Sequence, residues 1–172
     1  DWSSDVCSSD LAQCSEALEC AGTLCIALRE DWQPHMAQLL EPAMVTGLSD
    51  ALVFALHQAV DALPDLLPKV QDLLLDLLSL ALARRPFNPT TPSNTVLALQ
   101  ASLVGGDLQG SALIRLALQT LGGFSLVPHP LLDFVKDYVV PYLDDPEPPT
   151  RRAAARPSRR GRRWRGCAWK PR

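Results

Sequence analysis

Apolar residues recur every three or four positions along most of the chain, the spacing that places them on one face of an α-helix. No stretch alternates apolar and polar residues as a half-buried strand does. Short breaks rich in proline, glycine or serine separate the patterned stretches. The pattern predicts helices over residues 15–31, 34–46, 49–63, 65–83, 95–104, 111–121 and 131–143.

The strongest pattern runs from Asp65 to Ala83. Its polar residues form one narrow stripe at spacings of four, three and four, and leucine, valine or alanine fills most of the other positions; the stripe comprises Asp65, Lys69, Asp72 and Asp76. A helix with so wide an apolar arc has to be covered on two or three sides. We therefore expect an interior helix of a helical stack.

Local signals give expected helix ends. Ser49 is a good N-cap, and Asp50 follows in the first turn, where a negative charge is favourable. Gly47 should end the preceding helix, and Pro42 should kink or tighten it. Ser111 is expected to cap the helix that follows it. Residues 84–94, RRPFNPTTPSN, read as a loop that crosses between stacked units.

The stretch from Leu131 to Ala155 predicts an amphipathic helix, an acidic proline-rich turn and the start of a second helix. It resembles half of one HEAT-type repeat, a repeat in which a turn aspartate and an arginine early in the next helix bond between neighbouring repeats. The resemblance gives those places to Asp144 or Asp145 with Arg151 or Arg152. The alternative is that these aspartates and arginines are two clusters of solvated charges on either side of a turn, without a specific bond.

Composition supports helices packed on helices, since leucine supplies 31 of the 172 residues and aromatic residues are few. Charge divides the chain: residues 1–150 carry 6 basic and 19 acidic residues (6 − 19 = −13), and the rest carries 10 basic residues and no acidic one. Clustered Lys and Arg are needed to bind phosphates, so the acidic body is not expected to bind nucleic acid.

Candidate chemistry is sparse. The five cysteines form no CxxC pair, which argues against a zinc site or a disulfide framework, and Cys14 and Cys25 are expected to be buried, inert thiols. His35, His57 and His129 fall on separate elements. The sequence GGDLQG lacks the strand and the Lys of a phosphate loop. We expect no catalytic residue, cofactor, metal or small-molecule substrate.

The two ends of the chain differ from its body. Residues 1–11 resemble a translated sequencing adapter and are set aside as an artefact or a disordered leader. Residues 156–172 form a basic, disordered tail, which we attribute to a frameshift or to read-through into non-coding sequence. No secretory signal is recognised, and the Leu-rich run from Leu66 to Leu82 is too charged to span a bilayer, so a cytoplasmic location is expected.

Several segments, taken in order, resemble the HEAT-repeat region of the target of rapamycin (TOR) kinases. They are LLEPAMVTGLSDAL, VQDLLLDLLSLAL, IRLALQTLGGF and the stretch that begins at Leu131. The resemblance covers about Ala17 to Ala155 and departs most between Phe87 and Gly110. It implies an all-α fold, an α-solenoid of stacked antiparallel helix pairs (HEAT/armadillo-like) over residues 12–155. It also implies a scaffold fragment of a serine/threonine-protein kinase that holds TOR complex subunits and other repeats of the same chain.

None of the kinase motifs is present in these residues, so the fragment itself should not be an enzyme. A different class of function, binding of nucleic acid or a membrane surface, is suggested by residues 159–170, where Trp164 and Trp169 interleave with arginines. Finally, a fragment cut within a repeat should leave Leu131, Phe134 and Tyr138 without part of their cover.

Overall fold

The computed structural model describes residues 15–105, 108–124, 126 and 131–155, and this part of the chain is all-α and contains no strand. The termini expected to be disordered, Cys14 and His129 lie outside it. The helices are α2 (Ser15–Leu28), α3 (Gln33–Val45), α4 (Asp50–Ala62), α5 (Leu67–Ala83), α6 (Ser93–Gly105), α7 (Gly110–Gly123), α8 (Leu131–Phe134) and α9 (Pro148–Ala154).

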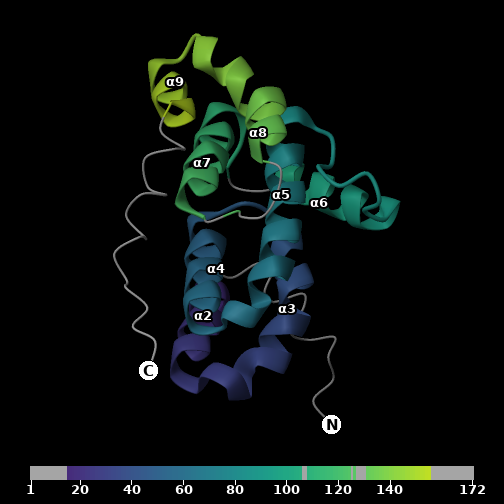
Figure 1. The fold of residues 1–172 in the computed structure, drawn as a ribbon, viewed down its shortest axis with the longest axis vertical. Helices are drawn as coiled ribbons and strands as arrows, with labels where there is room; N and C mark the ends of the chain where they lie inside the picture. The colour runs from purple at the N-terminus through teal and green to yellow at the C-terminus, as the bar shows by residue number, and fades with distance from the viewer. Residues whose placement is uncertain (1–14, 106–107, 125, 127–130, 156–172) are drawn as a thin grey trace.

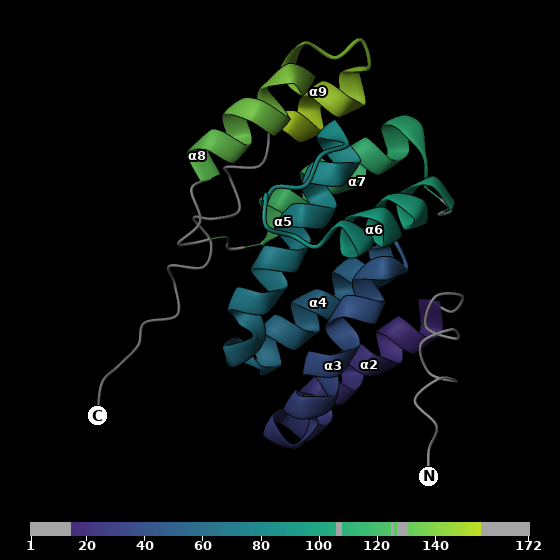
Figure 2. The same cartoon turned by 90° about the vertical axis from the view of Figure 1, so that its right-hand side faces the viewer.

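The helices form an elongated stack (Figures 1 and 2). In both views α2 and α3 lie at one end, α8 and α9 at the other, and α5 rises through the middle with α6 projecting to one side. Helix α2 packs mainly on α4, α3 and α7 both pack on α5, and α9 packs on α7. This arrangement is compatible with the predicted α-solenoid.

Helices α2 and α4 approach each other closely at Gly22. A Cβ atom built on this residue would lie 2.9 Å from the Cα of Ala55. Glycine therefore permits an approach that any larger residue would force apart. Leu18 and Cys25 flank the crossing and are buried, Cys25 as predicted, whereas Leu28 at the end of α2 is 44% exposed.

The predicted ends of α3 and α4 are confirmed. The Ser49 side chain accepts a hydrogen bond from the backbone N–H of Leu52 at 3.2 Å, as an N-cap does. Gly47 has a φ of +91°, and a Cβ there would lie 3.1 Å from the carbonyl oxygen of Ser102. A side chain is thus disfavoured at this position both by the backbone conformation and by the contact with α6. Pro42 lies inside α3.

Helix α5 is the enclosed helix that the sequence predicts, with Leu74, Leu77 and Leu78 fully buried. Its first turn differs, because Pro64–Leu66 is a 3-10 turn closed by a bond from the Leu67 N–H to the Pro64 carbonyl. Pro68 has no N–H to make the α-helical bond to that carbonyl. The polar stripe was also wrong in part, since Asp76 is only 5% exposed.

Two further boundaries differ from the prediction. Helix α7 begins at Gly110 with Gln109 as its N-cap, so Ser111 already lies inside the helix and does not cap it. The predicted helix after Leu131 is irregular: α8 continues as a π-helical turn, Val135–Val139, and a 3-10 turn, Val140–Asp144. Pro141, which has no N–H to donate, accounts for this change of hydrogen bonding.

Candidate protein-interaction surface

Of the four charged residues predicted at the HEAT turn, Asp144 ends the 3-10 turn Val140–Asp144, Asp145 follows it, and Arg151 and Arg152 lie in α9. Arg151 donates from Nη1 to the backbone carbonyls of Asp145 at 2.6 Å and Pro146 at 3.0 Å. The Asp145 carboxylate accepts the Glu147 N–H at 2.8 Å. Asp144 and Arg152 are exposed. Arg151 thus bonds to the backbone of its own turn, and a bond to a neighbouring repeat stays a prediction.

Asp76 is a buried anchor for the loop that joins α5 to α6, which spans residues 84–92 in the structure. Its carboxylate accepts the backbone N–H of Asn88 at 2.8 Å and the hydroxyl of Thr91 at 2.6 Å. A buried carboxylate needs such donors, because an unpaired one would be costly. Sequence reasoning missed this role, although a single aspartate among leucines, followed by a loop rich in threonine and asparagine, was a usable signal.

The same loop covers the aromatic residues of the α8 region. The Phe87 ring lies 5.4 Å from that of Phe134, which stacks at 4.6 Å on Tyr138. Arg85 lies 5.0 Å above the Tyr138 ring and 3.8 Å from the Asp137 carboxylate. Phe134 is 0% and Tyr138 8% exposed. The prediction that they lack cover was therefore wrong, because the loop packs over them; the side chain of Leu131 is not described.

Tyr142 makes a second connection between α5 and the residues after α8. Its hydroxyl donates to the carbonyl of Leu82 at 2.5 Å. Partial burial, and to a smaller extent the nearby Asp145 carboxylate, raise the pKa of Tyr142. The hydroxyl therefore keeps its proton and remains a donor at neutral pH.

An apolar groove of about 410 Å³ lies where α3, α5 and α6 meet, and its lining includes Met44, Val45, Leu73 and Ala98. Beside it, α6 exposes Leu97 (65%) and Val104 (73%). With the exposed Ala101 these residues are four and three positions apart, so they share one face of the helix. This apolar face and the groove form a surface suited to contact with another protein.

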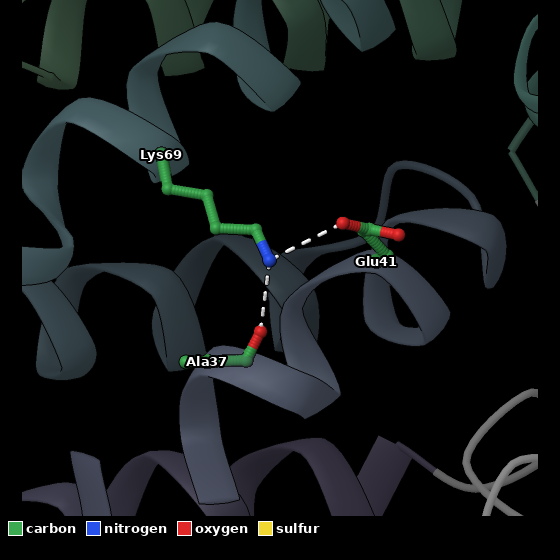
Figure 3. A network of polar contacts seen from close by, with 3 residues as sticks. All are labelled: Ala37, Glu41 and Lys69. Atoms are coloured by element: carbon green, nitrogen blue, oxygen red, sulfur yellow. Dashed lines mark hydrogen bonds and ion pairs between the residues drawn. The ribbon is translucent and has the colours of Figure 1, made fainter. Parts of the chain in front are cut away.

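Figure 3 shows a polar contact that joins α3 to α5. The Lys69 ammonium lies 3.2 Å from the Glu41 carboxylate and donates to the carbonyl of Ala37 at 3.0 Å. Both side chains are substantially exposed, at 43% and 65%. The pair orients two helices but contributes little stability, because water screens it.

Among the cysteine and histidine residues in the described ranges, Cys25 is buried, Cys20 is exposed, and His35 and His57 lie against aromatic rings. Cys25 is fully buried, as predicted, and burial raises the pKa of its thiol. The His57 ring stacks on Phe124 at 4.0 Å, and the His35 ring lies 5.1 Å from that of Trp32. Within the part of the chain that is described, no three His, Cys, Asp or Glu side chains are grouped to hold a metal ion.

Known proteins resemble this chain in sequence. The serine/threonine-protein kinase TOR of Arabidopsis thaliana is 39% identical over 145 residues, which cover 81% of this chain and 6% of that kinase. TOR of Oryza sativa subsp. japonica is 38% identical over 80% of this chain, and tor1 of Schizosaccharomyces pombe 32% over 80%; each is covered to 6%. The chain is homologous to a segment of the TOR kinases.

This TOR-related chain thus spans about 6% of the length of the curated relatives it matches. No family model and no solved structure matches it. Of the helices that the structure describes, none combines the length and the apolar character needed to cross a membrane. The family resemblance predicted from the order of the leucine-rich segments is confirmed.

Proposed function

We propose that the chain is a scaffold segment of a TOR-type serine/threonine-protein kinase, and that its helices bind other helical repeats of the same polypeptide and partner subunits of a TOR complex. The observation that carries the proposal is the match of four fifths of the chain to one short stretch of these much longer kinases. In such a scaffold, side-by-side helices present a long, semi-rigid surface on which partners are held without any chemistry.

Exposed apolar residues support this proposal. Each unit of a solenoid buries its apolar face only against a neighbour, so the outer units of an isolated segment expose some of it. Ile26 and Leu28 are about half exposed near the α2 end, and Val140 and Leu143 near the α9 end. We assign these ends to neighbouring repeats, and the α6 face with Leu97 and Val104 to a partner subunit.

The proposal places phosphoryl transfer in another part of the parent kinase. Phosphoryl transfer needs a bound nucleotide, metal ions and a base at fixed spacings, and the sequence of this chain supplies none of the motifs that hold them. We therefore expect no transfer of phosphate to a protein substrate when the chain alone is incubated with ATP and Mg²⁺. The parent is expected to act in the cytoplasm.

The decisive experiment uses the full-length kinase that carries this segment. A core variant replaces Leu74, Leu77 and Leu78, which are completely buried, by Asp, which places unpaired charges in the core of α5 at a cost of several kcal/mol each. A surface variant replaces Leu97 and Val104 by Asp, which leaves the core intact. We expect the core variant to lose its partner subunits, and the surface variant to lose at least one while remaining folded.

Gln38→Glu serves as the control, because it changes an exposed polar residue of α3. Limited proteolysis reports whether the segment is folded, and co-purification reports which subunits are retained. Phosphorylation by the kinase domain, after its separation from the variant segment, should be unchanged for every variant. Subunits retained at wild-type amounts by a core variant whose segment is demonstrably unfolded would exclude the scaffold role.

A further inference from the structure

We propose that Thr91 is a phosphorylation site for a proline-directed serine/threonine kinase, and that a phosphate on it releases the loop of residues 84–92 from α5. The sequence supplies the first observation. Thr91 precedes Pro92, and no other serine or threonine of the 172 residues is followed by proline. A residue before proline prefers extended backbone, the conformation in which a peptide enters a kinase cleft. Thr90 and Pro92, the neighbours of Thr91, are exposed.

The structure supplies the second observation. The Thr91 hydroxyl donates to the Asp76 carboxylate at 2.6 Å, and this carboxylate is almost completely buried. Thr90, by contrast, donates to the side chain of Asn88 at 2.7 Å in an exposed part of the loop. A modification at Thr91 therefore acts on a bond between the loop and the core, whereas one at Thr90 does not.

The reaction is an ordinary phosphoryl transfer. The Thr91 Oγ attacks the γ-phosphorus of ATP, an Oγ–P bond forms, and the bond between the γ-phosphorus and the β–γ bridging oxygen breaks. ADP leaves, and the hydroxyl proton passes to the base of the modifying kinase. The hydroxyl reaches that kinase only when the loop opens, so the rate should depend on how firmly Asp76 holds it.

The product cannot keep the bond. Phosphothreonine has no hydroxyl proton to donate, and it brings nearly two negative charges against a buried carboxylate. The repulsion favours the released loop. Because Arg85 and Phe87 belong to this loop, its release also removes the cover from Phe134 and Tyr138. Helix α6 begins at Ser93, just beyond the site, and a phosphate near its N-terminus leaves it helical.

The test incubates the whole chain with a purified proline-directed kinase, ATP and Mg²⁺. Peptide mass spectrometry locates the phosphate, and hydrogen exchange reports the loop and residues 134–138. We expect phosphate on Thr91 in the wild type and in Thr90→Ala, the matched control, and none there in Thr91→Ala. Asp76→Asn should be modified about tenfold faster, because a hydrogen bond to a charged acceptor is lost.

Hydrogen exchange in residues 84–91 and 134–138 should become at least about tenfold faster on phosphorylation. It should also be faster than in Thr91→Val, which removes the hydroxyl without adding charge. Absence of phosphate on Thr91 in both the wild type and Asp76→Asn would overturn the site. Unchanged exchange in the phosphorylated chain would overturn the release. If Asp76→Asn does not fold, Thr91→Glu in the wild-type background is used in its place. Hydrogen exchange in Thr91→Glu that is no faster than in Thr91→Val would likewise overturn the release.

Discussion

The pairing of α2 with α4 and the joining of α5 to the α8 region use different means. The first is a direct contact of two helices, close enough that Gly22 has no room for a side chain beside Ala55. The second runs through a loop, with the buried Asp76 on one side and the tilted contact between the rings of Phe87 and Phe134 on the other. Helix pairs in this stack thus pack by shape, whereas its irregular part depends on a few specific polar and aromatic contacts.

The largest effect is expected from Phe134→Ala, which should break the loop-mediated region. Phe134 is completely buried between Phe87 and Tyr138, so its removal leaves a cavity and should lower the free energy of unfolding by about 3–5 kcal/mol. Urea unfolding followed by circular dichroism measures it. Val140→Ala, at a site 47% exposed, is the control and should change stability by less than about 0.5 kcal/mol. Equal effects would refute the assigned role of the loop.

A smaller effect is expected from Gly22→Ala, which tests packing by shape in the α2–α4 pair. Forcing the helices apart costs about 1–3 kcal/mol, and the better helix propensity of alanine returns up to about 1 kcal/mol. The same urea experiment should show a net loss of about 1 kcal/mol. Cys20→Ala, at an exposed site on the same helix, should show no loss. A Gly22→Ala protein more stable than the wild type would show that the helices separate freely.

The smallest effect is expected from Lys69→Met, which asks whether an exposed polar contact matters as a buried one does. Methionine keeps an unbranched, largely apolar side chain that is one atom shorter, but the ion pair with Glu41 and the bond to Ala37 are lost. Because water screens the pair, the free energy of unfolding should fall by less than about 1 kcal/mol. Thermal unfolding at low and at high salt provides the measurement. A loss of more than about 2 kcal/mol in the free energy of unfolding would show that the packing of α3 on α5 depends on this polar contact.

The same comparison explains what the sequence could predict. Most of the helices, the Ser49 cap, the end at Gly47 and the enclosure of α5 depend on local spacing, and they were predicted correctly; the irregular helix after Leu131 was not. The burial of Asp76 and Phe134 was missed, because it depends on where the irregular loop of residues 84–92 folds back, and no periodicity encodes that path. Gly22 was missed for a similar reason, since only the opposing helix reveals why glycine is needed there.

The proposed interaction surface on α6 also could not be found from the sequence alone. Leu97 and Val104 lie in a helix that was predicted, but nothing in the spacing of α6 shows which of its apolar residues α5 and α3 cover. A bond between neighbouring repeats through Asp144 or Asp145 and Arg151 or Arg152 stays a prediction, and Arg151 and Asp145 bond to backbone groups of the turn. Their bonding to the backbone rather than to one another is a geometric detail that charge pattern alone does not contain.

The bond from Tyr142 to the Leu82 carbonyl affects the order in which the chain comes together. The two residues are 60 positions apart, whereas Asp76 and Asn88 are separated by 12. On loop length alone, closing the longer span costs about 1.4 kcal/mol more conformational entropy. The nearer contact is therefore favoured to form first, so that the far end of the stack is added to a surface already in place.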